Sequence, residues 1–127
     1  MSEVIFRQEC YEIIGACMRV HSEMGSGFLE KVYQECLRIE FAAVGIPCRE
    51  QSPIAIHYRN QQLESQYFAD FLLFDSILLE IKSLKSLLAE HEAQLLNYLS
   101  ATRLPLGLLV NFGSLGKLEY KRLAHSR

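Results

Sequence analysis

The sequence has no excess of positive charge, so its composition alone does not indicate a protein that binds polyanions such as nucleic acid. Its 127 residues contain 13 lysine and arginine against 15 aspartate and glutamate, giving a formal net charge of −2. A protein that binds polyanions without specificity usually carries a clear positive excess. Any contact with nucleic acid must therefore come from a few local basic groups or from bound cations.

Long hydrophobic runs and paired cysteine motifs are also missing. The longest apolar run near the N-terminus, Ile13 to Met18, is too short to span a membrane, and the acidic residues before it do not resemble the basic start of a signal peptide. We expect the cysteines to be reduced and buried, because none lies in a CxxC pair; they are Cys10, Cys17, Cys36 and Cys48. The sequence therefore predicts a cytoplasmic protein with no membrane segment.

No internal repeat, low-complexity segment or linker divides the sequence, and 50% of its residues are hydrophobic. A chain of this size can form one continuous core without disulfides or a structural metal. The histidines show no metal-ligand spacing, which argues against a zinc site; they are His21, His57, His91 and His125. We therefore predict a single domain over residues 1–127.

Hydrophobic periodicity predicts the secondary structure. Apolar residues repeated at helical spacing indicate three helices, the first two packed as an αα-hairpin, and apolar runs between turn residues indicate strands. The predicted helices cover residues 3–24, 28–44 and 86–101, the last capped by Ser86 or a neighbour, and the predicted strands cover residues 54–58, 63–74, 77–83, 106–112 and 117–123. The fourth strand lacks polar alternation and should be central, whereas the fifth should lie at an edge. This order, ααβββαββ, predicts an α/β sandwich.

Three charged residues interrupt the apolar stretch from Tyr67 to Lys82. Asp70, Glu80 and Lys82 are set among residues that would otherwise form pure core. Burying a charge costs several kcal/mol or more unless it is paired or binds a metal, so these residues indicate a site. Because side chains alternate along a strand, Glu80 and Lys82 project from the same face.

The geometry of the hairpin decides whether Asp70 joins them. A two-residue turn at Asp75-Ser76 would send Asp70 to the face opposite Glu80, because cross-strand partners share a face. A three-residue loop over residues 75–77 would pair Asp70 with Lys82 and gather all three charged groups on one side. We therefore predict an odd-length connection or a bulge near Asp70.

Several motifs resemble a known family. The segment Gly27-Phe-Leu-Glu30-Lys-Val-Tyr33 is similar to the signature of the GxxExxY family, and the resemblance continues through residues 80–82, 91–98 and 107–113. That family resembles a branch of the PD-(D/E)XK nuclease superfamily, and Gln94 with Tyr98 resembles the QxxxY motif of its RecB-like and lambda-exonuclease-like members. The resemblance implies a restriction-endonuclease-like core, a central mixed β-sheet flanked by helices.

The resemblance also implies a role for each residue at the site. Asp70 and Glu80 would be the metal-binding carboxylates, with Ala69 standing where the family name has proline. The backbone carbonyl of Ile81 lies between Glu80 and Lys82 and could add a third oxygen ligand to Mg²⁺ or Mn²⁺. The implied catalytic residues are Glu30, Asp70, Glu80, Lys82, Gln94 and Tyr98, of which Glu30 would also bind metal, directly or through water.

Two functions fit these residues. The first is a metal-dependent nuclease that hydrolyses phosphodiester bonds of DNA or RNA, in which Lys82 orients or deprotonates the attacking water or stabilises negative charge on the phosphate. The alternative is a non-catalytic module that keeps the nuclease fold to bind nucleic acid or a protein. A lysine beside two carboxylates favours catalysis. The small size and acidic charge favour a partner protein or a homo-oligomer.

Overall fold

The computed structural model describes residues 5–125, so residues 3 and 4 of the first predicted helix lie outside the described residues. The predicted element order is confirmed. The elements are α1 (Arg7–Met24), α2 (Glu30–Val44), β1 (Cys48–Tyr58), β2 (Gln61–Leu73), β3 (Ile77–Lys82), α3 (Ala89–Thr102), β4 (Leu106–Asn111) and β5 (Glu119–Ala124).

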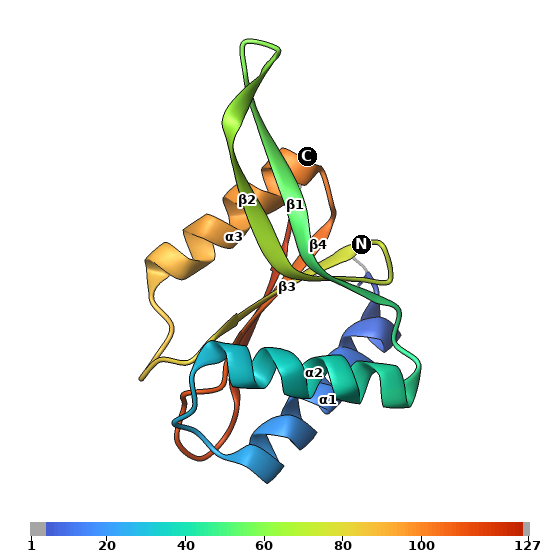
Figure 1. Cartoon of the computed structure of the whole chain (residues 1–127), viewed down its shortest axis with the longest axis vertical. Coiled ribbons are helices and arrows are strands. Elements are labelled where there is room, and N and C mark those ends of the chain that lie inside the picture. The colour runs from blue at the N-terminus through green and yellow to red at the C-terminus, as the bar shows by residue number, and fades with distance from the viewer. Residues whose placement is uncertain (1–4, 126–127) are drawn as a thin grey trace.

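The five strands form one mixed sheet in the order β1-β2-β3-β4-β5. β3 and β4 run parallel, because α3 connects them across the sheet, and the other neighbouring pairs are antiparallel. As predicted, β4 is buried along its whole length and β5 is an edge strand. The mixed sheet flanked by helices agrees with the predicted fold class (Figure 1).

The predicted start of β1 is wrong. β1 begins at Cys48 rather than at Ile54, because its polar first half pairs with the buried end of β2, a contact between distant residues that local hydrophobicity does not reveal. Pro53 is tolerated there because β1 is the other edge strand, where a missing amide donor is harmless.

Helices cover the two faces of the sheet unequally. α1 and α2 pack together on one face, where Tyr33, Phe41 and Phe71 belong to the larger hydrophobic cluster. α3 covers the other face with a smaller cluster that includes Leu95, Tyr98 and Leu99. Ile77, Leu79 and Ile81 of β3 lie in the first cluster and Leu78 lies in the second, so the predicted alternation along β3 is confirmed.

The β1–β2 hairpin extends well beyond the rest of the sheet (Figure 1). Its two-residue turn, Arg59-Asn60, has φ values of 50° and 64°, the left-handed geometry that matches the twist of the flanking strands. Residues 61–68 of β2 are all exposed. In β2, the buried positions therefore begin at Ala69, and the part of the hairpin near its turn lies outside the core.

Asn111 fixes the loop that joins β3 to α3. Its buried side chain accepts hydrogen bonds from the backbone N–H groups of Leu84 and Gly113 and donates to the Leu84 carbonyl and to Glu119. The loop passes so close to Gly113 that a Cβ there would lie 2.2 Å from the Leu84 oxygen. α3 then begins after Leu88, whose N–H donates to His91 Nδ1, so the helix cap involves His91 and not Ser86.

We expect Gly113→Ala to lower the free energy of unfolding by roughly 1–3 kcal/mol, because the added methyl group displaces the loop backbone. Chemical denaturation followed by circular dichroism measures the change. Gly15→Ala is the matched control, since a Cβ at that helical position meets nothing nearer than 3.5 Å. Equal stability of the two variants would contradict the close approach of the loop.

Within the described residues, no helix is long and apolar enough to cross a membrane. All four cysteines are free; Cys10 and Cys17 are buried, but Cys36 and Cys48 are only partly buried, so the predicted burial is wrong for these two. Their reduced state agrees with the sequence analysis, while the cellular location stays a prediction.

Candidate active site

The connection between β2 and β3 is a three-residue loop, so the predicted odd length is confirmed. The loop covers Phe74–Ser76, one position earlier than predicted, because Ile77 is fully buried and belongs to β3. Phe74 and Asp75 adopt φ values of 53° and 55° to make the turn. Continuing the register from the Leu73–Ile77 pair brings Asp70 opposite Glu80. The predicted pairing of Asp70 with Lys82 is therefore wrong.

The two strands part at the position of Asp70 and Glu80. Paired positions end at Phe71 and Leu79. Beyond them the backbone N–H of Asp70 donates to Glu80 Oε2 at 2.9 Å, and the N–H of Ile81 donates to Asp70 Oδ2 at 2.8 Å. Each carboxylate thus takes the place of a backbone acceptor on the neighbouring strand. This exchange keeps the amides satisfied and holds both carboxyl groups where the strands separate.

β2 changes direction at the same residue. Strict alternation of side chains would place Ala69 and Phe71 on the same face of β2. Instead, Ala69 packs in the smaller cluster under α3, and Phe71 packs in the larger cluster under α1 and α2. On β1, Gln51 faces this point with a φ of 49°. The pairing register of β1 and β2 is the same before and after Gln51 and Asp70. β2 is therefore kinked at Asp70 without an inserted residue. Strained, non-glycine backbone of this kind is concentrated at functional sites.

Burial raises the pKa of both carboxyl groups, and the charges of neighbouring carboxylates add to the shift. The pKa of Glu80 is raised to about 8, first by burial and then by the charge of Asp70. Burial is also the main reason that the pKa of Asp70 is raised, and the charge of Glu30 adds to it, while the Ile81 N–H and Lys82 oppose the shift. The pair therefore holds a proton near neutral pH. A cation placed between the two groups would remove this repulsion.

This arrangement makes stability depend on pH in metal-free buffer. Between the ordinary pKa of 4.5 and the raised value of about 8, the folded protein keeps a proton on Glu80 that the unfolded chain loses. The free energy of unfolding should therefore fall as the pH rises through this window. Glu80→Gln should flatten the dependence and leave the protein more stable above pH 8, by on the order of 1–2 kcal/mol.

Thermal unfolding with EDTA at several pH values measures this effect. Glu64→Gln is the control, because it is the same substitution at an exposed position of the neighbouring strand β2. A wild-type stability that rises between pH 5 and 8, or an equal response of the two variants, would contradict the raised pKa of Glu80.

Lys82 follows on the same strand and face as Glu80. Its side chain is half-buried, and its charge lowers the pKa of both Asp70 and Glu80, which indicates that the ammonium group lies near them. Within the described residues, none of the ion pairs includes Lys82. Its backbone carbonyl accepts from the Phe112 N–H, so the main chain is fixed while the ammonium group stays available.

Glu30 stands exposed in the first turn of α2. The approach to this turn is fixed by Tyr33, whose hydroxyl donates to the Gly25 carbonyl at 2.6 Å and accepts from the Phe28 N–H at 3.2 Å. Gly27 has a φ of 113°, which favours glycine. In the Gly27–Tyr33 motif, Gly27 and Tyr33 therefore fix the loop between α1 and α2, whereas the Glu30 side chain is exposed to solvent. Its charge raises the pKa of Asp70 and Glu80.

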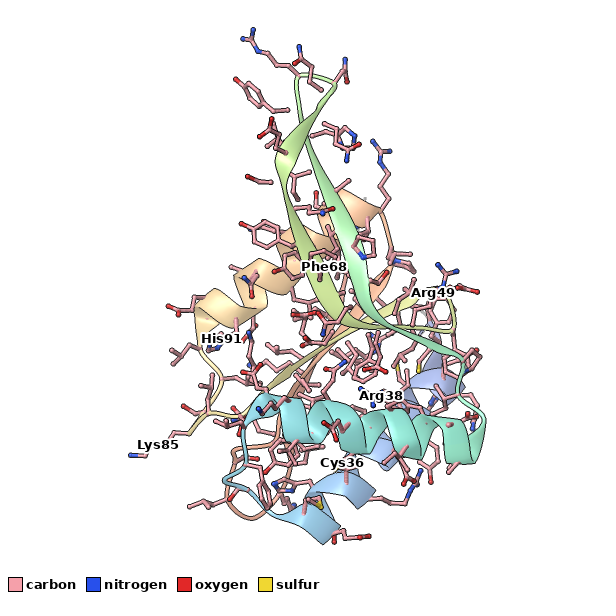
Figure 2. The ribbon with its side chains drawn as sticks, in the orientation of Figure 1. Cys36, Arg38, Arg49, Phe68, Lys85 and His91 are labelled. Atoms are coloured by element: carbon pink, nitrogen blue, oxygen red, sulfur yellow. The ribbon has the colours of Figure 1, made fainter. Side chains whose placement is uncertain are left out.

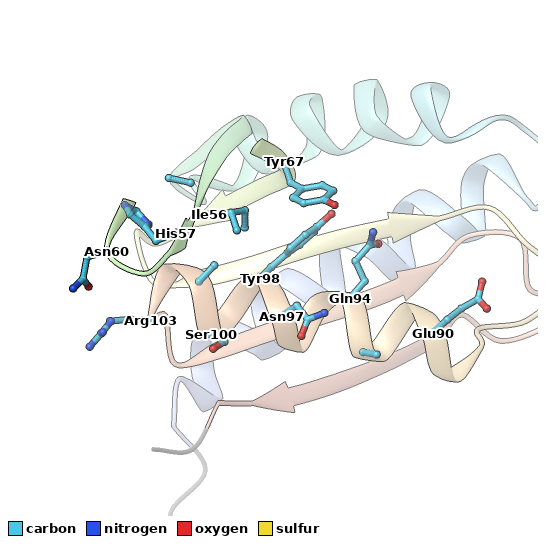
Figure 3. Close-up of a pocket in the computed structure, with 13 residues that line it drawn as sticks. Ile56, His57, Asn60, Tyr67, Glu90, Gln94, Asn97, Tyr98, Ser100 and Arg103 are labelled. Carbon is cyan, nitrogen blue, oxygen red and sulfur yellow. The ribbon is translucent and has the colours of Figure 1, made fainter. Parts of the chain in front are cut away.

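Gln94 and Tyr98 line one cavity from α3, as their helical spacing predicted (Figure 3). Gln94 is exposed, whereas Tyr98 is 6% exposed and belongs to the α3 cluster. The pKa of Tyr98 is raised to about 12, first by burial and then by the charge of Glu80. Its hydroxyl therefore keeps its proton and remains a hydrogen-bond donor close to Glu80.

A polar network behind the site was not predicted from the sequence. The amide of Gln34 donates both to the Asp70 carbonyl and to Glu50 Oε1, each at 3.1 Å, and Arg38 forms an ion pair with Glu50. Arg38 is labelled on α2 in Figure 2. Glu30, Gln34 and Arg38 recur at four-residue spacing along α2, a polar stripe that is visible in the sequence. The network ties α2 to the kinked part of β2.

The donor set fits an oxygen-preferring divalent cation. Within residues 5–125, no three His, Cys, Asp or Glu side chains are gathered closely enough to hold an ion by themselves. Of the predicted metal-binding side chains, the structure brings together the carboxylates of Asp70 and Glu80, and Glu30 is not assembled with them. Two carboxylates, one backbone carbonyl and water are ligands typical of Mg²⁺ and Mn²⁺. The repulsion between the carboxyl groups is the feature that such an ion would relieve.

The sheet topology and the carboxylate pair at the parting strands define an α/β protein of the restriction-endonuclease-like fold. The sequence profile of the PD-(D/E)XK nuclease superfamily matches residues 7–123, and the chain belongs to this superfamily. Its narrower resemblance to the GxxExxY family stays a prediction. No curated protein matched the sequence.

Solved structures show the same fold at low sequence identity. The protein SSO0001 is 18% identical with a TM-score of 0.60, over 77% of this chain and 50% of that one. An alkaline exonuclease (LHK-Exo) from Laribacter hongkongensis is 15% identical with a TM-score of 0.56, over 99% of this chain and 73% of that one. The chain thus spans half the length of SSO0001.

Proposed function

We propose that the protein is a metal-dependent nuclease that hydrolyses phosphodiester bonds in nucleic acid, with DNA as the favoured substrate. The observation that supports this most strongly is the reciprocal pair of hydrogen bonds that places the Asp70 and Glu80 carboxylates together where β2 and β3 part. A purely structural hairpin would gain nothing from two buried, mutually repelling carboxyl groups. Membership in the PD-(D/E)XK nuclease superfamily supports the same conclusion.

Asp70, Glu80 and the Ile81 carbonyl would hold Mg²⁺ or Mn²⁺, with Glu30 as a water-mediated ligand. When bound, the ion supplies charge neutralisation at the phosphate and lowers the pKa of a nearby water. Binding requires both carboxyl groups to be ionised, so Glu80 must release its proton. Metal affinity should therefore rise with pH up to the pKa of Glu80, which is about 8.

The remaining residues act on the substrate. The ammonium group of Lys82 would face the scissile phosphate, where it stabilises developing negative charge or orients the attacking water. Tyr98 offers a hydroxyl that keeps its proton, because burial and the charge of Glu80 raise its pKa. Gln94, one turn earlier on α3, offers an amide that can donate to a phosphate oxygen. Tyr98 and Gln94 would both position the nucleic acid strand beside Lys82.

A direct assay tests the function. Purified protein is incubated with single-stranded, duplex and branched DNA and with RNA, each with Mg²⁺, Mn²⁺ or EDTA. We expect cleavage with Mg²⁺ or Mn²⁺ and none with EDTA. Binding to these substrates without cleavage in any metal would contradict the nuclease and favour the non-catalytic module.

A further inference from the structure

A cavity of about 1010 Å³ lies between the β1–β2 hairpin and α3 (Figure 3). The hairpin lines it with Ile56 and Tyr67, and α3 lines it with Gln94, Asn97 and Tyr98. Tyr98 is close enough to Glu80 for the charge of that carboxyl group to raise the tyrosine pKa. The cavity shares Gln94 and Tyr98 with the candidate active site and therefore adjoins it, and it has the size of pockets that bind organic ligands.

Tyr67 presents a large aromatic surface to this cavity. Its side chain is 48% exposed, and its ring lies 5.4 Å from the ring of Tyr98 at an interplanar angle of 41°. A tyrosine with this exposure on a protruding strand contributes little to the core. Such a ring is suited to stack against a planar ligand, as aromatic side chains do with unpaired bases.

The polar lining changes along the cavity. Arg103, which ends α3 with a φ of 61°, lies near Asn60 at one end, and Glu90 lies at the other (Figure 3). Asn97 and Gln94 lie between them on α3 and offer amide donors and acceptors. The series of cation, aromatic ring and amides matches a phosphate, a base and the sugar–phosphate backbone that follows it.

We propose that this cavity binds an unpaired nucleotide of the substrate strand, with its base against Tyr67, its phosphate at Arg103, and the strand continuing past Gln94 to the Asp70–Glu80 pair. The inference rests on the proposed nuclease function and names its substrate class, a single strand or a single-stranded end. A base in a duplex has both faces covered by its neighbours, so it offers Tyr67 no surface for stacking. The net charge of −2 also leaves little general attraction for duplex phosphates.

Fluorescence anisotropy with a labelled oligothymidylate, in EDTA so that no metal-dependent cleavage occurs, tests the proposal. We expect Tyr67→Ala to weaken binding roughly tenfold and Tyr67→Phe to retain it, because stacking needs the ring and not the hydroxyl. Phe68→Ala is the matched control: Phe68, labelled in Figure 2, is the next residue on β2 and is also 48% exposed, but it is not among the residues that line the cavity. We also expect an unlabelled single strand to compete better than a blunt duplex of the same length.

The proposal is overturned if Tyr67→Ala and Phe68→Ala bind equally well, or if the duplex competes as well as the single strand. Hydrolysis of a small nitrophenyl phosphodiester, which is too short to reach Tyr67, separates this failure from failure of the nuclease function. Unchanged hydrolysis of this diester in Tyr67→Ala, with weakened strand binding, supports the proposal. Strand binding through Tyr67 without hydrolysis of any diester would support the cavity and contradict the nuclease.

Discussion

Asp70→Asn is expected to lower the rate of nucleic acid cleavage by at least about a thousandfold, because the several kcal/mol that a bound ion contributes to the transition state is lost with its ligand. The substitution keeps the size of the side chain and one oxygen, so Ile81 N–H retains an acceptor. Glu80→Gln should have an effect of the same order, since the two carboxylates act as a unit. Initial rates on the best substrate in Mg²⁺ measure both.

Asp75→Asn is the matched control. Asp75 lies in the loop of the same hairpin and forms only an exposed ion pair with Arg49. Its replacement should leave cleavage unchanged. Retention of cleavage in both Asp70→Asn and Glu80→Gln would place the reaction elsewhere in the molecule.

Lys82→Ala is expected to lower cleavage by at least about a hundredfold while leaving metal binding intact, because a protonated lysine stabilises charge but donates no electron pair to a cation. The free ammonium group near both carboxylates supports this separation of roles. Single-turnover cleavage combined with Mn²⁺ titration of the same variant distinguishes the two steps.

Lys85→Ala serves as the comparison, because Lys85 is an exposed lysine in the loop after β3. It should cleave at the wild-type rate. If Lys82→Ala lost metal binding along with cleavage, Lys82 would be needed to maintain the carboxylate pair and would not act on the phosphate.

The sequence indicated the candidate site residues more accurately than the pairing between their strands. Asp70, Glu80 and Lys82 were recognisable because charges in apolar strands are costly to bury. The register was predicted one position off, because Phe74 ends an apolar run typical of a strand, whereas in the structure it has a φ of 53° and begins the loop. Asp70 and Glu80 still share a face, as expected for an odd-length loop.

Other features depended on contacts between distant residues. The kink of β2 at Asp70, opposite Gln51, and the hydrogen bonds of Gln34 to Glu50 and to Asp70 involve separate elements, so no local pattern specifies them. Tyr67 is similar, because it becomes part of the cavity only when the hairpin lies against α3. By contrast, the element order could be predicted because it follows from periodicity and turn residues alone.

Calorimetric titration of the purified protein with Mn²⁺ tests most directly whether Asp70 and Glu80 form a metal site. We expect the wild-type protein to bind Mn²⁺ with an affinity that rises as the pH approaches about 8, the raised pKa of Glu80. In Asp70→Asn and Glu80→Gln the affinity should fall at least about tenfold, because a neutral amide replaces an anionic ligand. Equal Mn²⁺ affinity in the wild-type protein and both variants would show that Asp70 and Glu80 do not form a metal site.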